Sequence, residues 1–196
     1  KVRKILKPIV EVLAGIPSVI VGYFALKFIA PEIVNPIFSP DQPRNMLVSG
    51  LAIGVLVVPI MASISEDALR AVPSSLREAS YGIGARKSTT TIRIVLPAAV
   101  SGIVAAFIIA TSRAIGETMV AAMAGGRDGS GPRTLNPLEP GLTMTAAMTN
   151  AAGGTDQVNS GAPFQVLFFV GLLLFLMTMT LNVIGDRFVQ RVRQQY

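Results

Sequence analysis

Cysteine and histidine are absent from this chain. Their absence excludes disulfides, thiol nucleophiles, imidazole bases and Cys/His metal sites, so carboxylates, hydroxyl groups and lysines remain as the only candidate catalytic groups. A hydrolytic active site is hard to build from that set. We therefore predict a protein that is not an enzyme, with no catalytic residue and no metal or cofactor site.

Charged and aromatic residues are also scarce, at 14% and 6% of the 196 residues, whereas hydrophobic residues make up 51% and the mean hydropathy is +0.59. So few charges do not cover the surface of a soluble domain, and this balance is typical of a membrane protein with several spans. The formal charge of +6 would also suit a nucleic-acid binder. Such proteins gather Lys and Arg into a patch, whereas here the basic residues lie between apolar runs. We therefore predict an all-α integral membrane protein that binds no nucleic acid.

Four stretches are apolar enough to cross a hydrocarbon core, which takes about 20 residues. They are residues 8–30, 46–64, 96–123 and 164–184. In the first span, Pro17 removes one backbone hydrogen bond and predicts a kink. Glu11 and Lys27 lie near the two ends of that span, where their charged groups can snorkel to the interface; a place on a solute path is the alternative. In the second span, Gly50 and Gly54 form a GxxxG motif that allows another helix to approach closely.

The distribution of basic residues predicts which loops are cytoplasmic. Residues 31–45 contain four prolines and predict a loop, and residues 124–163 predict a longer Gly- and Pro-rich loop, with helix-forming character at residues 144–152. Lys and Arg number four, one, five, two and three in the five regions outside the spans, in chain order. This alternation predicts that both ends of the segment and residues 65–95 are cytoplasmic, and that residues 124–163 are extracytoplasmic.

Residues 65–95 form the polar segment between the second and third spans. Ser65 is a candidate cap for a short helix. Pro73 is a candidate for the start of a second short helix, which we expect to end at a glycine turn at Gly84. Pro97 then suits the first turn of the third span. The segment therefore predicts two short helices with a glycine turn.

The polar segment also carries a spaced motif, which consists of Glu78-Ala79-Ser80, three residues, Gly84, nine residues, and then Ile94, Leu96 and Pro97. This pattern resembles the EAA loop of the permeases of ABC importers, the binding-protein-dependent type I superfamily with a MetI-like transmembrane domain. The resemblance implies a short coupling helix that docks on a separate cytoplasmic ATPase and transmits its movement to the spans. An ordinary cytoplasmic loop is the alternative. Ser80 is a mild departure from the small apolar residue of the pattern, and Ser88 stands where related permeases often have a bulky aromatic.

Residues 82–88 (GIGARKS) end in Lys-Ser, as a phosphate-binding P-loop does. The residue before Lys87 is Arg86 rather than glycine, however, and no strand precedes the motif. We predict that this chain binds no ATP by itself and that a partner ATPase supplies the energy.

Arg113 and Glu117 lie within the third predicted span, four residues apart and hence on one helix face. Each would cost about 2.5 to 3.5 kcal/mol at a lipid-exposed helix centre, so we expect both to face the bundle interior or an aqueous path. One interpretation is a structural ion pair between helices. The other is a substrate site, because a guanidinium presents paired donors that suit a tetrahedral oxyanion.

Residues 113–118 (RAIGET), together with residues 13–19, 72–79 and 168–196, are similar to the phosphate-specific (Pst) permeases, and more to the PstC type than to the PstA type. This resemblance implies phosphate as the solute, with Arg113 and Glu117 on its path, and a place in the bacterial inner membrane. It also implies a PstA-type partner permease, two copies of an ATP-binding subunit and an extracytoplasmic phosphate-binding protein. Pst permeases have six spans, so we expect two more before Lys1. A permease for sulfate, molybdate or another solute is the alternative within the superfamily, and a membrane-embedded enzyme or a scaffold lies outside it.

Overall fold

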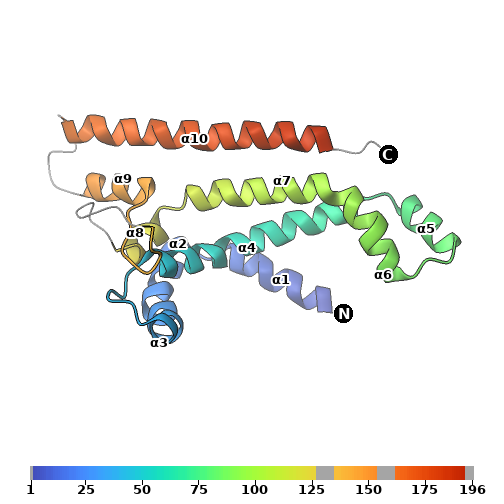
Figure 1. Ribbon diagram of the computed structural model, residues 1–196, viewed down its shortest axis with the longest axis horizontal. Helices are drawn as coiled ribbons and strands as arrows, with labels where there is room; N and C mark the ends of the chain where they lie inside the picture. The colour runs from blue at the N-terminus through green and yellow to red at the C-terminus, as the bar shows by residue number, and fades with distance from the viewer. Residues whose placement is uncertain (1, 127–134, 154–161, 193–196) are drawn as a thin grey trace.

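The structure is a computed structural model that describes residues 2–126, 135–153 and 162–192. Within these residues the regular secondary-structure elements are all helices: α1 (Val2–Ala14), α2 (Ser18–Phe24), η1 (Ala25–Val34), α3 (Asn35–Phe38), α4 (Met46–Ala71), α5 (Ser74–Gly82), α6 (Lys87–Thr90), η2 (Thr91–Val95), α7 (Leu96–Ile115), α8 (Met119–Ala124), α9 (Met144–Gly153) and α10 (Ala162–Val192). Two of them, η1 and η2, are π-helical. Figure 1 shows α4, α7 and α10 extended along the longest axis of the molecule.

Four helical stretches of the described chain are long and apolar enough to cross a membrane. They are Ser18–Phe38, Met46–Ala71, Lys87–Ile115 and Phe164–Arg191, with mean hydropathy of 1.3 for the first and 2.4 for each of the others. The prediction of an all-α membrane fold with four spans is therefore confirmed, although the bounds of the helices differ from the expected ones.

The first span lies later in the chain than the predicted residues 8–30. The helix α1 ends at Ala14, and α2 begins after Pro17, whose φ of −58° and ψ of 134° are not helical. Proline disfavours the helical conformation of the residue before it, so Pro17 separates two helices where we expected a kink within one. The helix then continues to Phe38, into the first half of the predicted loop of residues 31–45. Pro31 lies in the π-helical η1, whose i→i+5 bonding loosens the turn that a proline ring would otherwise obstruct.

The second and third spans also extend beyond their predicted bounds. The helix α4 continues through residues 65–71, where a separate capped helix was expected, and an Arg70–Glu66 ion pair of 3.2 Å supports its last turns. The third span begins at Lys87 rather than at Leu96, with Pro97 following the π-helical η2 within one continuous stretch. It ends at Ile115, eight residues before the predicted bound at residue 123.

Small residues set the packing between the spans. The helices α4 and α7 approach each other closely at Gly102, where an added Cβ would overlap the Ala68 side chain. By contrast, a Cβ at Gly50 or Gly54 would meet nothing within 4 Å in the described chain. The GxxxG motif is therefore not used for packing within the described chain. The close helix contact that we expected at this motif occurs at Gly102 instead.

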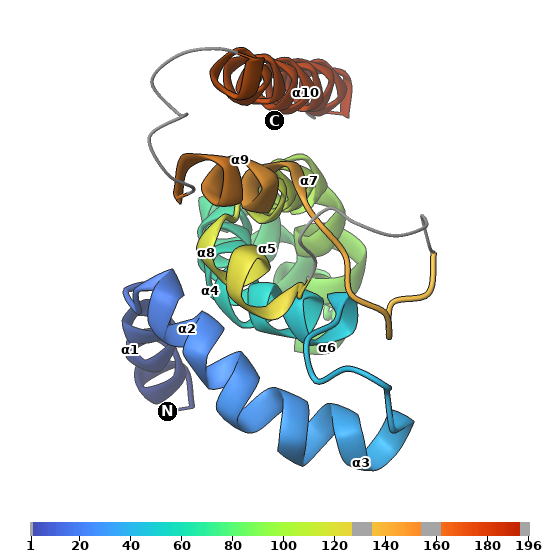
Figure 2. The ribbon, with the colours of Figure 1, turned by 90° about the vertical axis from the view of Figure 1, so that its left-hand side faces the viewer.

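The last helix, α10, lies on the outside of the described chain and packs on α7 and α9. Gly185 meets Ile108 of α7, and the Ser112 hydroxyl donates a hydrogen bond of 2.8 Å to Asn182 Oδ1. The helix is longer than the predicted residues 164–184. Figure 2 shows α9 between α10 and α8, which agrees with the contacts among these three helices.

The two ends of the molecule differ in their elements. The helices α5 and α6 lie at one end, toward which α1 begins and α10 ends, whereas α3, α8 and α9 lie at the other (Figure 1). The amide groups of Met46 and Leu47 at the start of α4 donate to the carbonyl oxygens of Glu139 and Pro137, at 3.1 and 2.7 Å. These bonds satisfy first-turn donors of α4 and fix the segment before α9 at the second end.

Candidate functional site

The helix α5 carries the start of the EAA-like motif at one end of the molecule. It begins after Pro73, whose extended ψ of 138° turns the chain away from α4, and it ends at Gly82. Gly84 follows with φ of +81°, a left-handed conformation that L-residues other than glycine rarely adopt. The predicted helix opened by Pro73 and its glycine turn are therefore both present in the structure.

A buried hydrogen bond closes the turn after α5. The hydroxyls of Ser80 and Thr90 lie 2.8 Å apart, and these residues are only 2% and 1% exposed. The Ala85 amide donates to the Ser80 carbonyl oxygen at 3.1 Å. The structure therefore explains why a serine stands at the third motif position in this chain: its hydroxyl forms a hydrogen bond with Thr90 across the turn. The role of Thr90 cannot be recognised from the sequence, because Ser80 and Thr90 lie ten residues apart and no motif links them.

An apolar cluster holds α5 against the ends of α4 and α7. It is built on the buried residues Val72, Val95 and Ala99, with Leu76 of α5 packed against them. Arg77 Nη2 donates to the Leu69 carbonyl oxygen near the end of α4, at 2.7 Å. A force on α5 would therefore be transmitted directly to two of the spans.

The outer surface of this turn is exposed and partly apolar. Glu78, Ala79 and Gly84 are exposed, and so are Leu96 and Pro97, whereas Ile94 is half-buried. Ile83, a residue that the motif does not include, is 86% exposed at the tip. The structure thus divides the motif into Ser80, which faces inward, and Glu78 and Ala79, which face outward next to an apolar tip.

Arg113 and Glu117 do not share a helix face, contrary to the prediction. Gly116 caps α7, and the amide of Glu117 donates to the Ala114 carbonyl oxygen at 3.2 Å in a tight turn. Arg113 is exposed in the last turn of α7, whereas Glu117 is 8% exposed. The two residues make no ion pair with one another or with any other described residue. The chain leaves the helix at Gly116, so the one-turn spacing no longer aligns the two side chains.

Polar contacts with neighbouring elements fix the turn at Glu117. The Thr145 hydroxyl of α9 donates to the Glu117 carbonyl oxygen at 2.8 Å, and the Val120 amide of α8 lies 3.5 Å from Glu117 Oε1. A buried carboxylate is costly without a cation, a strong donor or a proton. Neither contact supplies a cation, so the Glu117 carboxyl group has a long hydrogen bond from the Val120 amide and no ionic partner among the described residues.

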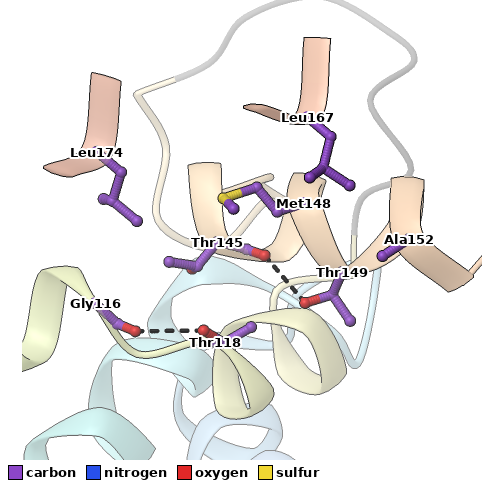
Figure 3. A pocket seen from close by; sticks show the side chains of 8 residues that line it. All are labelled: Gly116, Thr118, Thr145, Met148, Thr149, Ala152, Leu167 and Leu174. Carbon is purple, nitrogen blue, oxygen red and sulfur yellow. Dashed lines mark hydrogen bonds between the residues drawn. The ribbon is translucent and has the colours of Figure 1, made fainter. Parts of the chain in front are cut away.

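A pocket of 320 Å³ lies between this turn, α9 and α10, and is lined by Gly116, Thr118, Thr145, Met148, Thr149, Ala152, Leu167 and Leu174 (Figure 3). Its three threonine hydroxyls donate to backbone carbonyl oxygens, at 2.8 to 3.3 Å. Their hydrogens are therefore already engaged, and the wall presents acceptors and methyl groups. Such a wall does not suit an oxyanion, so the pocket is not the anion site that the sequence predicted at Arg113.

Comparison with protein families gives a match over nearly the whole chain. The family described as "Binding-protein-dependent transport system inner membrane component" matches residues 1–195. The chain is 31% identical to a protein of Bacillus subtilis (strain 168) named "Probable ABC transporter permease protein YqgH", over 90% of this chain and 55% of that protein. It is 34% identical to the "Phosphate transport system permease protein PstC 1" of Mycobacterium tuberculosis, over 94% of this chain and 60% of that protein.

A third relative, the "Phosphate transport system permease protein PstC" of Mesorhizobium japonicum, is 30% identical over 97% of this chain and 63% of its own length. The chain thus spans between about half and two thirds of the length of these relatives. Among solved structures, a chain of the MetNI methionine ABC transporter in an inward-facing conformation superposes with a TM-score of 0.73. That match has 23% identity and covers 99% of this chain and 77% of the other, so it shows a common fold. The chain belongs to the family of binding-protein-dependent transport system inner membrane components, and it has the type I ABC importer transmembrane fold.

Proposed function

We propose that this chain is part of the PstC-type permease subunit of an ATP-driven importer of inorganic phosphate. The observation that carries the proposal is the turn at the end of α7, where Arg113 and Glu117 have no ionic partner among the described residues, in a chain whose relatives are named phosphate permeases. Membership of the family indicates transport, and the side chains at this turn indicate that the transported solute is an anion.

The chemistry of the two side chains suits hydrogen phosphate. A guanidinium offers paired N–H donors in a plane, which match two oxygens of a tetrahedral oxyanion. Glu117 accepts a hydrogen bond and so recognises the proton that hydrogen phosphate carries and fully ionised sulfate lacks. The Glu117 charge also keeps the binding of the anion from becoming too tight for release. The separation of Arg113 on the surface from Glu117 in the interior is consistent with a site that is completed as the transporter changes conformation.

The energy for transport comes, in this proposal, from a separate ATPase that docks on α5. The exposed Glu78, Ala79 and Ile83 supply the contact surface, and the attachment of α5 to α4 and α7 carries the movement into the spans. Two copies of this ATPase, a PstA-type permease and an extracytoplasmic phosphate-binding protein complete the assembly. The end with α5 and α6 is then cytoplasmic, as the excess of Lys and Arg in residues 65–95 indicates.

Uptake of labelled phosphate by the assembled transporter in membrane vesicles tests the substrate. We expect ATP-dependent uptake that a large excess of unlabelled phosphate abolishes and that sulfate or molybdate leaves unchanged. Uptake that sulfate or molybdate suppresses as strongly as phosphate does would assign the transporter to another oxyanion.

Substitution of Arg113 tests the anion site in the same assay. A hydrogen bond to a charged group contributes about 1.5–3 kcal/mol, so Arg113→Gln should raise the apparent KM for phosphate roughly tenfold to hundredfold. Arg187→Gln is the matched control, because Arg187 is also an exposed arginine of a spanning helix. Equal KM values for Arg113→Gln and Arg187→Gln would exclude Arg113 from the site.

A further inference from the structure

The first span carries three hydrogen-bonding side chains on a face that the described chain leaves uncovered. Tyr23 is 58% exposed, and Lys27 and Glu32 are also exposed. The opposite face of the same span is buried in the core with α4 and α8, through residues such as Val21 and Ile29. The span therefore has one face that packs within the chain and one face that is open.

The π-helical geometry of η1 aligns these three residues, which we name the polar stripe (Tyr23, Lys27 and Glu32). Tyr23 and Lys27 are four residues apart at the end of α2 and the start of η1, so they lie on successive turns. Lys27 and Glu32 are five residues apart, and i→i+5 hydrogen bonding brings residues at that spacing onto neighbouring turns, which a regular α-helix does not do.

The position of Lys27 along the apolar helical stretch does not favour the snorkelling that the sequence suggested. Lys27 lies nine residues after Ser18 and eleven before Phe38, at the middle of the span. At about 1.5 Å per residue its Cα is on the order of 14 Å from either end, farther than a flexible four-carbon stem reaches. The shift of the first span from residues 8–30 to Ser18–Phe38 therefore moves Lys27 from near one end of the apolar stretch to its middle.

Neither charge of the polar stripe is neutralised within the described chain, since Lys27 and Glu32 form no ion pair with any described residue. A charge facing lipid at this depth costs about 2.5–3.5 kcal/mol. A dry protein contact would have to supply partners for an ammonium, a carboxylate and a phenol together. Water satisfies all three groups without a dedicated partner.

We propose that the polar stripe lines a water-filled part of the solute path, on the face of the first span that points away from this chain's own core. Lys27 attracts the anion, and Glu32 offsets that charge so that the anion is not trapped. The anionic nature of the solute rests on the proposed function, whereas the hydration of the polar stripe does not.

Single-cysteine labelling tests the hydration directly, because the 196 residues contain no cysteine of their own. Lys27→Cys and Glu32→Cys are made in the assembled transporter in membrane vesicles, treated with a charged, water-soluble thiol reagent, and read as a gel shift of this subunit. Phe24→Cys and Phe28→Cys are the matched controls, because these rings are 44% and 46% exposed on the same span and lack polar groups.

We expect labelling at positions 27 and 32 and little at 24 and 28, since a thiol must be in water to ionise and react. Two results would overturn the proposal: a Lys27→Cys subunit that stays unlabelled while the transporter is intact, or equal labelling of all four variants. The first result would place Lys27 in a dry contact or in lipid.

Protection by the solute separates this inference from the proposed function. Phosphate that slows the labelling of Glu32→Cys, in which Lys27 is kept, with sulfate inactive, supports a position of the polar stripe on the anion path. Labelling of Glu32→Cys that no oxyanion slows overturns the role of Lys27 toward the anion. The uptake assay with competing oxyanions decides independently whether phosphate is the solute, so either idea can fail without the other.

Discussion

Substitution of Gly84 is the sharpest test of the proposed coupling through α5. Gly84 has φ of +81°, and an added Cβ would meet nothing within 4 Å. A side chain at this position therefore causes no steric clash with the rest of the chain, and its cost is that of the left-handed backbone, about 1–2 kcal/mol for an L-residue. That energy corresponds to a roughly 5- to 30-fold shift of the turn away from its native conformation.

Because the strain is local, the spans should remain folded while α5 loses its orientation. We expect Gly84→Ala, and more strongly Gly84→Val, to lower the phosphate transported per ATP hydrolysed in reconstituted vesicles, with little change in the melting temperature of the detergent-solubilised complex. Gly84→Asn should retain more coupling than Gly84→Ala, because asparagine visits the left-handed region more readily.

Gly82→Ala is the matched control. Gly82 lies at the end of α5, its φ is not positive, and an added Cβ there also meets nothing within 4 Å. Alanine in a helix is favoured over glycine by roughly 0.5–1 kcal/mol, so this variant should couple normally. If Gly82→Ala and Gly84→Ala lose coupling equally, or if Gly84→Val transports as the wild type does, the reasoning from the backbone conformation is refuted.

Two further predictions concern stability. Ser80→Ala removes the bond to Thr90, whose hydroxyl keeps its contact with the Arg86 carbonyl oxygen at 3.2 Å, so we expect a loss of only about 1 kcal/mol in thermal unfolding; an unchanged melting temperature would show that the pair is not formed. Gly102→Leu overpacks the α4–α7 contact and should cost about 1–3 kcal/mol, whereas Gly50→Leu, which meets nothing in the described chain, should cost less. The reverse order of these two variants would contradict the packing described for α4 and α7.

The structure of α5 and of the glycine turn after it could largely be predicted from the sequence, because these features are local. Pro73 and Gly84 impose backbone conformations that depend on the residues themselves, so the start of α5 and the glycine turn are where the pattern indicated. The pairing of Ser80 with Thr90 was not predictable, since it depends on how the chain returns after the turn.

The turn after α7 was harder to predict, because its geometry depends on tertiary contacts. The spacing of Arg113 and Glu117 indicated one helix face, but α7 stops at Gly116 and the contact of Thr145 with the Glu117 carbonyl fixes the turn from a distant helix. Similarly, Pro31 suggested a loop, whereas in the structure it lies inside the π-helix η1. The span that contains η1 packs on α4 and α8. In both places, contacts between residues far apart in the sequence determined a backbone conformation that the local sequence pattern did not predict.

The dependence of phosphate uptake on ATP hydrolysis tests the central claim most directly. The assembled transporter, reconstituted in vesicles with its binding protein, is supplied with labelled phosphate and either ATP or a non-hydrolysable analogue. We expect phosphate to accumulate inside against its gradient with ATP and not to accumulate with the analogue. Accumulation with the analogue, or ATP hydrolysis that never moves phosphate, would contradict an ATP-driven phosphate importer.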